Sequence, residues 1–117
     1  MIQKVNSYRA QHGLGALRSS SSLNRSASRY ARHMMKAHYF GHAGRIQASR
    51  RFRTVGEILE MHRGYGARTS SALKAWGNSP GHRAIILDGR FKYVGAGVFH
   101  GKYQGHRMTF WVMHFGT

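Results

Sequence analysis

The chain has 117 residues, 41% of them hydrophobic, which suits one globular domain over residues 1–117 and is too short for two. It contains no cysteine, so a disulfide framework and a thiolate metal site are excluded. No apolar run is long enough to cross a bilayer, and we expect no signal peptide, because Lys4 and Arg9 interrupt the only candidate stretch.

The charge balance is extreme. Nineteen lysines and arginines face three acids, Glu57, Glu60 and Asp88, which gives a formal net charge of +16 at pH 7. Because so few carboxylates are available, most basic side chains must lie in solvent, where they repel one another. This excess favours a polyanionic partner, namely nucleic acid, an anionic cell-wall polymer or a lipid surface. Solubility alone would also account for it, and the sequence leaves both explanations open.

Two helices are predicted in the first third of the chain. Apolar residues recur at helical spacing from Ile2 to Tyr8, and the glycines that follow would end this short helix. The serine run at 19–22 supplies an N-cap for a longer helix from about residue 22 to residue 38, whose apolar stripe includes His38 as a packing residue. Another face of this helix is purely cationic and would bind an anion through Arg25, Arg29, Arg32 and Lys36.

The segment after this helix combines glycines, aromatic rings and histidines. His42 follows a glycine, and we expect a loop in which this imidazole faces a cleft. Residues 45–53 are expected to form a short basic helix with Ile46 and Phe52 turned inward. This helix would extend the anion-binding surface by three further cations, Arg50, Arg51 and Arg53.

Residues 55–61 are predicted to form a strand in which Glu57 shares a face with apolar neighbours. An unpaired carboxylate in such surroundings is costly, so Glu57 needs a histidine, an arginine or a metal ion as its partner. Glu60, on the opposite face, is expected to form an ordinary salt bridge.

The pair Ser79–Pro80 is typical of a helix start, because serine is a good N-cap and proline fits the first helical position. This puts His82 in the first turn, near the positive end of the helix dipole, which favours the neutral imidazole that accepts a proton or binds a metal. A packing role for His82 is the alternative. Before this helix we expect a loop over residues 64–71 and a helical segment over residues 71–76.

Residues 93–100 and 109–115 are apolar on both faces, as expected for central strands of a covered sheet. The glycine-containing loop between them predicts an antiparallel hairpin. Helices before these strands, with one strand between, predict an α+β fold.

Sequence motifs narrow the possible chemistry. No G-x-S-x-G elbow, phosphate-binding glycine loop or H-E-x-x-H pair is present, so a serine nucleophile has little support from motifs. The candidates that remain are His42, Glu57 and His82, each beside a glycine and each at the edge of a predicted element.

Seven short motifs lie in order along nearly the whole chain. They are Asn6-x-x-Arg9 with Gly13-Leu14 and Leu17; Ala27 to Met34; Phe40-Gly-His42; Gly56-Glu57; Trp76-x-x-Ser79-Pro-Gly-His-Arg83; Val94-Gly-x-Gly97; and Trp111 to Gly116. Together they resemble the CAP superfamily, or SCP-like domain, of cysteine-rich secretory proteins, antigen 5 and pathogenesis-related 1 proteins, in its short bacterial form.

The resemblance implies a three-layer α-β-α sandwich with a small, mainly antiparallel sheet and a cleft that carries His42, Glu57 and His82. In relatives, the paired histidines can hold a divalent ion such as zinc, so His42 and His82 become candidate metal ligands. It also implies a secreted or envelope-associated protein of bacterial type.

Two departures from the family pattern bear on activity. The usual Gly-Glu-Asn-Ile is here Gly56-Glu57-Ile58-Leu59, and the second glutamate that many eukaryotic members carry just after the tryptophan is replaced by the run Gly77-Asn78-Ser79. The acidic pair is therefore reduced to Glu57. If this carboxylate were a zinc ligand, no second one would be left to act as a base.

The sequence favours a CAP-type module with a His/Glu cleft, which is a candidate site for a divalent metal, and a strongly cationic surface for an anionic partner. One alternative is a hydrolase of peptide or ester bonds that uses a metal-bound or Glu57-activated water. The other is a non-specific binder of nucleic acid or another polyanion.

Overall fold

The computed structural model describes residues 2–65 and 80–117. In chain order its elements are α1 (Ile2–Gln11), β1 (Arg18–Ser19), α2 (Ser21–Lys36), β2 (Val55–Arg63), α4 (Pro80–Ile86), β3 (Tyr93–Tyr103) and β4 (His106–Gly116). The predicted helices near residues 2–12 and 22–38 and all three predicted strands are present. The strands extend beyond their predicted bounds, and the two-residue strand β1 was not predicted.

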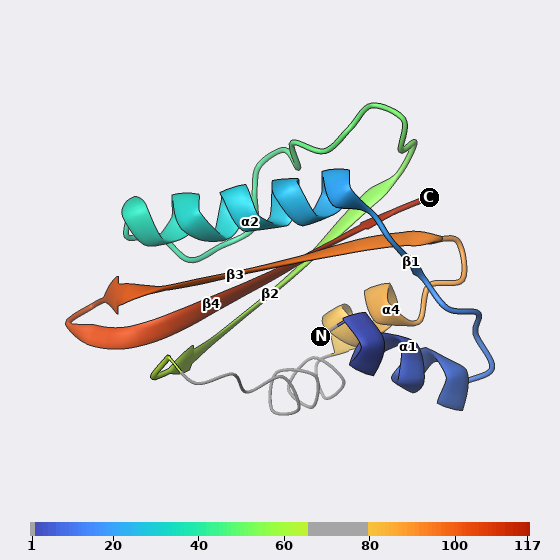
Figure 1. Cartoon of the computed structure of the whole chain (residues 1–117), viewed down its shortest axis with the longest axis horizontal. Coiled ribbons are helices and arrows are strands. Elements are labelled where there is room, and N and C mark those ends of the chain that lie inside the picture. Colours follow the sequence, from blue (N-terminus) through green and yellow to red (C-terminus); the bar gives the residue numbers. More distant parts are fainter. Residues whose placement is uncertain (1, 66–79) are drawn as a thin grey trace.

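The strands form one sheet in the order β1-β3-β4-β2. Strands β3 and β4 form the predicted antiparallel hairpin, and β2 pairs antiparallel with the other edge of β4. Only β1 runs parallel to its neighbour, β3, so the sheet is mixed. Helix α2 covers one face, and α1 and α4 lie on the other (Figure 1). The α+β, three-layer architecture is therefore confirmed.

Both faces of the central strands are buried, as their continuous apolar sequences require. On the face under α2, Leu59, Phe110 and Val112 pack with Ala27 and Met34. The opposite face, towards α1 and α4, holds the larger cluster: Val5, Leu17, Ile58, Ile86, Phe91, Val94, Trp111, Met113 and Phe115. Alternate residues of β2 and β4 thus enter different layers, which is the period-two pattern of a strand.

Two glycines let α2 lie directly on β3. A Cβ atom at Gly95 would stand 2.1 Å from the backbone carbon of Leu23, and one at Gly97 would stand 2.4 Å from the amide nitrogen of Ser28. Real Cβ atoms do not approach backbone this closely, so only glycine fits at these positions. The first turns of α2 are therefore seated closer to the sheet than side-chain packing would allow.

Polar residues of the first motif join α1 to the rest of the fold. Asn6 exchanges two hydrogen bonds with the backbone of Leu17, its amide donating to the carbonyl at 3.0 Å and its oxygen accepting from the N–H at 2.7 Å. Arg9 is buried and donates to the carbonyl oxygens of Gly15 (2.9 Å), Ile86 (2.8 Å) and Asp88 (3.1 Å). These contacts tie α1 to the end of α4, 77 residues away in sequence.

Two local predictions are wrong. Helix α2 ends at Lys36, and His38 is an exposed residue with a positive φ of 52°, so it does not continue the apolar stripe. Residues 45–53 contain no helix. This stretch carries four arginines and no acid, so a helix would hold like charges one turn apart. It is anchored instead by Phe52, which is buried.

The predictions for residues 66–71, the helical segment at 71–76 and the Ser79 N-cap lie outside the described residues. Among the helices that are described, none is both long and apolar enough to cross a bilayer.

Candidate functional site

Glu57 lies on β2 beneath α2 and is the centre of the site. Its side chain is 3% exposed, and both carboxylate oxygens accept hydrogen bonds. Oε1 accepts from the backbone N–H of Ala43 at 2.9 Å and lies 3.1 Å from Nδ1 of His42. Oε2 lies 2.7 Å from Nε2 of His114. The predicted need of this buried carboxylate for a histidine partner is met twice.

These contacts set the charge of Glu57. Burial by itself would raise the pKa of its carboxyl group, but the hydrogen bond from His114, that from the Ala43 amide, the charge of His114 and the hydrogen bond from His42 together outweigh burial. The pKa of Glu57 is therefore below its usual value, and the carboxylate is ionised at neutral pH.

His114 is the residue of the site that the sequence prediction missed. It lies on β4, directly opposite Glu57 in the β2–β4 register, and is 1% exposed. Its Nδ1 lies 2.7 Å from Oγ of Ser26, which is on α2 and 4% exposed. His114 stands inside residues 109–115, a stretch that is predicted to be an apolar strand covered on both faces, and no role is predicted for it. The available signal is that His114 is an ionisable residue in a strand predicted to be covered on both faces.

His42 belongs to the segment after α2 and reaches Glu57 from outside the sheet. Because an ionised carboxylate only accepts hydrogen bonds, Nδ1 of His42 is the protonated nitrogen in this contact. The proton assignment follows from the network. It leaves Nε2 of His42 as the nitrogen that can meet a ligand, and the side chain is 59% exposed.

Among the described residues, no hydrogen bond joins His82 to this network. His82 is half-buried on α4, and its buried Nδ1 has no hydrogen-bond partner in the part of the chain that the structure describes. Burial lowers the pKa of His82, the charge of Glu60 opposes this shift, and the charge of His42 adds to it. The predicted preference for the neutral imidazole is thus supported, with burial as the main cause. Glu60 accepts a hydrogen bond from the N–H of Met61, and no ion pair of Glu60 is found among the described residues.

The donor set does not fit a resident zinc ion. Structural zinc sites use four protein ligands and catalytic ones three. In the described ranges, no group of three or more histidines, aspartates and glutamates is placed to share an ion. Glu57 accepts three hydrogen bonds, so most of its acceptor sites, about four in a carboxylate, are already engaged. Only the imidazoles of His42 and His82 would remain as ligands.

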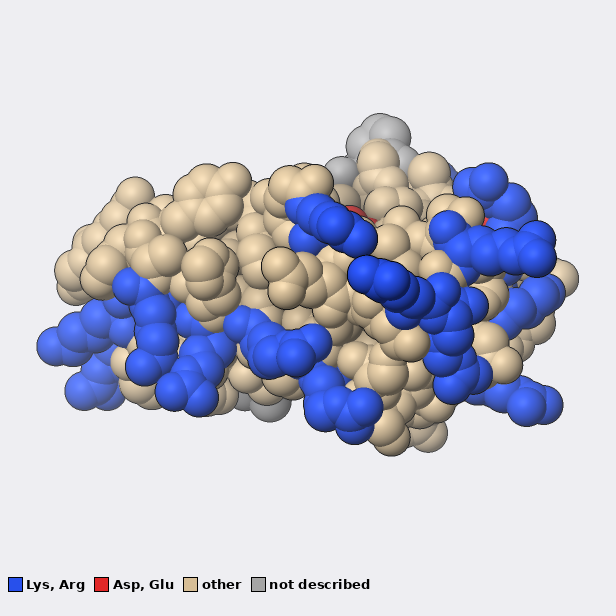
Figure 2. Space-filling view, turned by 90° about the horizontal axis from the view of Figure 1, so that it is seen from above, with Lys and Arg blue, Asp and Glu red and all other residues tan. Residues whose placement is uncertain are grey.

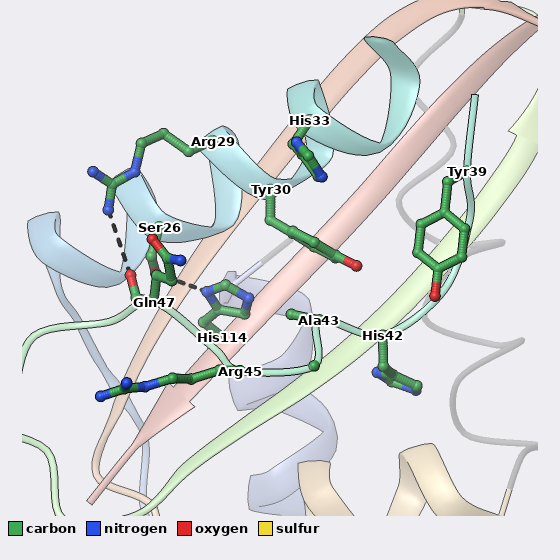
Figure 3. Close-up of a pocket in the computed structure, with 11 residues that line it drawn as sticks. Ser26, Arg29, Tyr30, His33, Tyr39, His42, Ala43, Arg45, Gln47 and His114 are labelled. Carbon is green, nitrogen blue, oxygen red and sulfur yellow. Dashed lines mark hydrogen bonds between the residues drawn. The ribbon is translucent and has the colours of Figure 1, made fainter. Parts of the chain in front are cut away.

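A pocket of about 520 Å³ opens between α2, the segment 39–47 and the end of β4. Figure 3 shows Tyr39 and His42 on one side, Arg29 and Arg45 on the other, and Ser26 and His114 joined by a hydrogen bond. The described lining residues are Ser26, Arg29, Tyr30, His33, Tyr39, His42, Ala43, Gly44, Arg45, Gln47 and His114. Neither Glu57 nor His82 is among them.

The described wall of this pocket contains hydrogen-bond donors and cations but no carboxylate. Arg29 donates a long hydrogen bond of 3.4 Å to the carbonyl of Gln47, which leaves most of its donors available. The hydroxyl of Tyr30 donates to the carbonyl of Gly41. Burial and, to a lesser extent, the charges of Glu57 and Tyr39 raise the pKa of Tyr30 to about 12, so the phenol keeps its proton.

Cations also spread over the surface around this pocket. Figure 2 looks down on the α2 side and shows lysine and arginine side chains along most of this face, with almost no acid visible. All seven residues predicted to bind anions are exposed: Arg25, Arg29, Arg32, Lys36, Arg50, Arg51 and Arg53. Of these, Arg51 is held over the rings of Phe52 and Tyr93, with its guanidinium carbon 5.4 and 5.5 Å from the ring centres.

Comparisons with known proteins agree with this architecture. The family model of the cysteine-rich secretory protein family (CAP) matches residues 2–115. An uncharacterized protein of Bacillus subtilis, YkwD, is 29% identical over 107 residues, which cover 83% of this chain and 40% of that protein. The chain therefore spans less than half the length of this relative.

Solved structures share the fold. An outer surface protein from Borrelia burgdorferi has a TM-score of 0.80 at 19% identity, covering 99% of this chain and 88% of that one. The structure of NaASP2 with Zn2+ has a TM-score of 0.75 at 16% identity, covering 98% of this chain and 76% of that one. Because the family model matches residues 2–115, which is almost the whole chain, the chain belongs to the cysteine-rich secretory protein (CAP) family.

Proposed function

We propose that this CAP domain works at the cell surface or outside the cell as a binding module for an anionic polymer. The pocket beside α2 would bind one anionic group of the polymer, and the surrounding cations would bind its other anionic groups. The observation that carries the proposal is the composition of the pocket wall, where Arg29 and Arg45 stand among imidazoles and hydroxyls with no carboxylate in the described lining.

Electrostatics supports this role more strongly than net charge alone does. Of the three acids, Asp88 is paired with Arg90 at 2.7 Å, and Glu57 is buried beneath α2 and accepts hydrogen bonds there, so neither carboxylate stands exposed beside the arginines of the α2 face. An anion that enters the pocket would therefore relieve repulsion between neighbouring cations. The location rests on the family, whose description is secretory, and on the outer surface protein that shares its fold.

Binding of two polyanions tests the proposal. Linear polyphosphate and a short DNA duplex would be titrated into the protein by calorimetry at several salt concentrations. The double variant Arg29→Ala, Arg45→Ala removes both pocket cations, and Arg18→Ala, Lys92→Ala is the matched control, because it removes the same charge from exposed positions lining no part of the pocket. We expect at least a tenfold loss of polyphosphate affinity for the pocket variant, about 1.4 kcal/mol, and a much smaller loss for the control.

The same titrations separate the alternatives. Equal losses in both variants, with the same affinity for DNA and polyphosphate, would mean that only net charge matters and would leave a non-specific polyanion binder. For such binding to DNA the logarithm of affinity falls against the logarithm of salt with a slope of about −0.9 per phosphate neutralised. No binding of either polymer near physiological salt would end the proposal.

A metal component is a separate prediction. Two imidazoles, those of His42 and His82, would hold a divalent ion only weakly, so we expect zinc affinity far below that of a three-ligand site. Calorimetric titration with zinc, compared with His42→Ala and His82→Ala, checks this. Equal heats in all three proteins would remove the metal component.

One version of the hydrolase alternative has Glu57 activate a water molecule, and nothing in the described part of the site supports it. Both oxygens of this carboxylate accept hydrogen bonds from the protein, so it offers little capacity to a water molecule.

A further inference from the structure

A serine, an imidazole and a carboxylate form a continuous hydrogen-bonded chain beside the pocket. Oγ of Ser26 lies 2.7 Å from Nδ1 of His114, and Nε2 of His114 lies 2.7 Å from Oε2 of Glu57. The three residues come from α2, β4 and β2, and all are buried. A nucleophile within hydrogen-bond reach of a base, with the base oriented by a third group, is the arrangement that activates serine for acyl transfer.

We propose that Ser26 is a nucleophile and His114 its general base, and that the pocket accepts an ester carrying an anionic group. Glu57 is a positioning residue, which holds the proton of His114 on Nε2 and so leaves Nδ1 free to accept the proton of Ser26. The anionic character of the substrate rests on the proposed anion binding. The reactivity of Ser26 does not.

Access to the pocket distinguishes Ser26 from an ordinary buried helix serine. Ser26 and His114 both line the 520 Å³ pocket, although each side chain is nearly covered. Arg29 follows Ser26 by one turn of α2 and lines the same pocket. Arg29 is the arginine of α2 that lines the pocket, so its guanidinium is the candidate on that helix to stabilise negative charge as it develops on a bound ester.

The hydroxyl of Ser26 has two acceptors within reach. Besides Nδ1 of His114, the carbonyl oxygen of Leu23 lies 3.1 Å from Oγ. When the hydroxyl donates to Leu23, Nδ1 must itself carry a proton and donate to Oγ, so His114 is then a cation beside Glu57. When the hydroxyl donates to Nδ1, His114 is neutral and the serine is activated. The reactive arrangement thus differs from the other by one proton and a rotation of the hydroxyl.

The reaction balances with these groups and water. Oγ of Ser26 forms a bond to the carbonyl carbon of the ester while its proton passes to Nδ1 of His114. The bond from that carbon to the leaving oxygen breaks, and the leaving group takes the proton from Nδ1. Water then attacks the acyl-serine, gives one proton to Nδ1, and releases the carboxylic acid as Ser26 recovers its hydrogen.

A fluorophosphonate probe tests the reactivity directly, because a nucleophilic serine displaces fluoride from phosphorus and keeps the label. We expect an adduct on Ser26, located by mass spectrometry, and none in Ser26→Ala. Ser28→Ala is the matched control, because Ser28 is an exposed serine on the same helix that does not line this pocket. His114→Gln should slow labelling by about 10²-fold or more, the usual contribution of a general base.

A second measurement needs no buried substitution. Labelling of Ser26 in the native wild-type protein should exceed its labelling in guanidinium-unfolded protein by at least tenfold, because only the fold activates it. The proposal fails if the folded wild type, checked by circular dichroism, gives no Ser26 adduct, or if Ser26 and Ser28 are labelled equally. Hydrolysis of a neutral and a succinate-bearing p-nitrophenyl ester then tests the substrate class: equal rates would overturn the anionic class and leave the nucleophile in place.

Discussion

Replacement of Glu57 by glutamine tests whether the buried carboxylate and the hydrogen bonds that it accepts stabilise the fold. Glutamine has the same shape but presents an NH₂ group either to His114 or to the two donors at His42 and Ala43, so at least one of the three hydrogen bonds to the carboxylate must be lost. Breaking a buried ion pair by removing one partner costs about 3–5 kcal/mol. Because glutamine keeps part of the network, we expect a loss of about 3 kcal/mol at pH 7, at the low end of that range.

From the size of the chain, this loss in the free energy of unfolding can be expressed as a decrease in melting temperature. For a domain slightly above 100 residues, 1 kcal/mol shifts Tm by about 4 °C, so Glu57→Gln should melt about 12 °C below the wild type. Glu60→Gln is the matched control, because it removes the same charge from the opposite face of β2, where no ion pair of Glu60 is found among the described residues. Its expected effect is within about 0.5 kcal/mol.

The pH dependence gives a second readout with a definite sign. The pKa of Glu57 is lower in the folded protein than in the unfolded chain, so its stabilising effect is fully present above the unfolded value of about 4.3. It is lost as the pH falls through the lower, folded value. The difference between wild type and Glu57→Gln should therefore shrink below pH 4. A gap in Tm that stays constant down to pH 3, or equal shifts for Glu57→Gln and Glu60→Gln, would refute the reasoning.

Contacts elsewhere in the fold lead to three more predictions. Arg9→Lys cannot reproduce the guanidinium's hydrogen bonds to three carbonyls, so the free energy of unfolding by urea should fall by about 2 kcal/mol; an unchanged midpoint would contradict a stabilising role for these bonds. His82 should titrate by NMR below the usual imidazole pKa of about 6.5, since burial favours its neutral form, so acidification below that pH removes stability; a higher midpoint would contradict this. Phe52→Ala should cost about 3 kcal/mol of stability and Phe52→Leu clearly less, if this ring anchors residues 45–53.

Elements with a clear period could be predicted from the sequence. The apolar residues of α2 recur at helical spacing, which predicts a helix with one buried face. The runs in β3 and β4 are apolar on both faces, which predicts strands covered on both sides. The two-residue strand β1 could not be predicted, since its existence depends on the distant β3 edge. The helix predicted at 45–53 was wrong because inward-facing Ile46 and Phe52 are as compatible with an irregular anchored segment.

The site was only partly predictable for a related reason. Glu57 stood out because a carboxylate in an apolar strand needs a partner, and that requirement is correct. Its partner His114 was hidden, because the strand register that places the two opposite each other is a property of the folded sheet. Ser26 carried no signal, since a serine within a helix has many neutral roles and its neighbour on β4 is 88 residues away.

The absence of side chains at Gly95 and Gly97 matters for the site as well as for the packing of α2. Gly95 is the direct neighbour of His114 in the β3–β4 register, and the helical turn seated on Gly95 and Gly97 is the one that carries Ser26. Any larger residue at these two positions would lift that turn and stretch the contact between the Ser26 hydroxyl and the His114 imidazole, although no polar residue of the site is itself replaced. Activity and anion binding should therefore respond differently to such a substitution, since the arginines of α2 can follow the displaced helix and the serine cannot keep its reach.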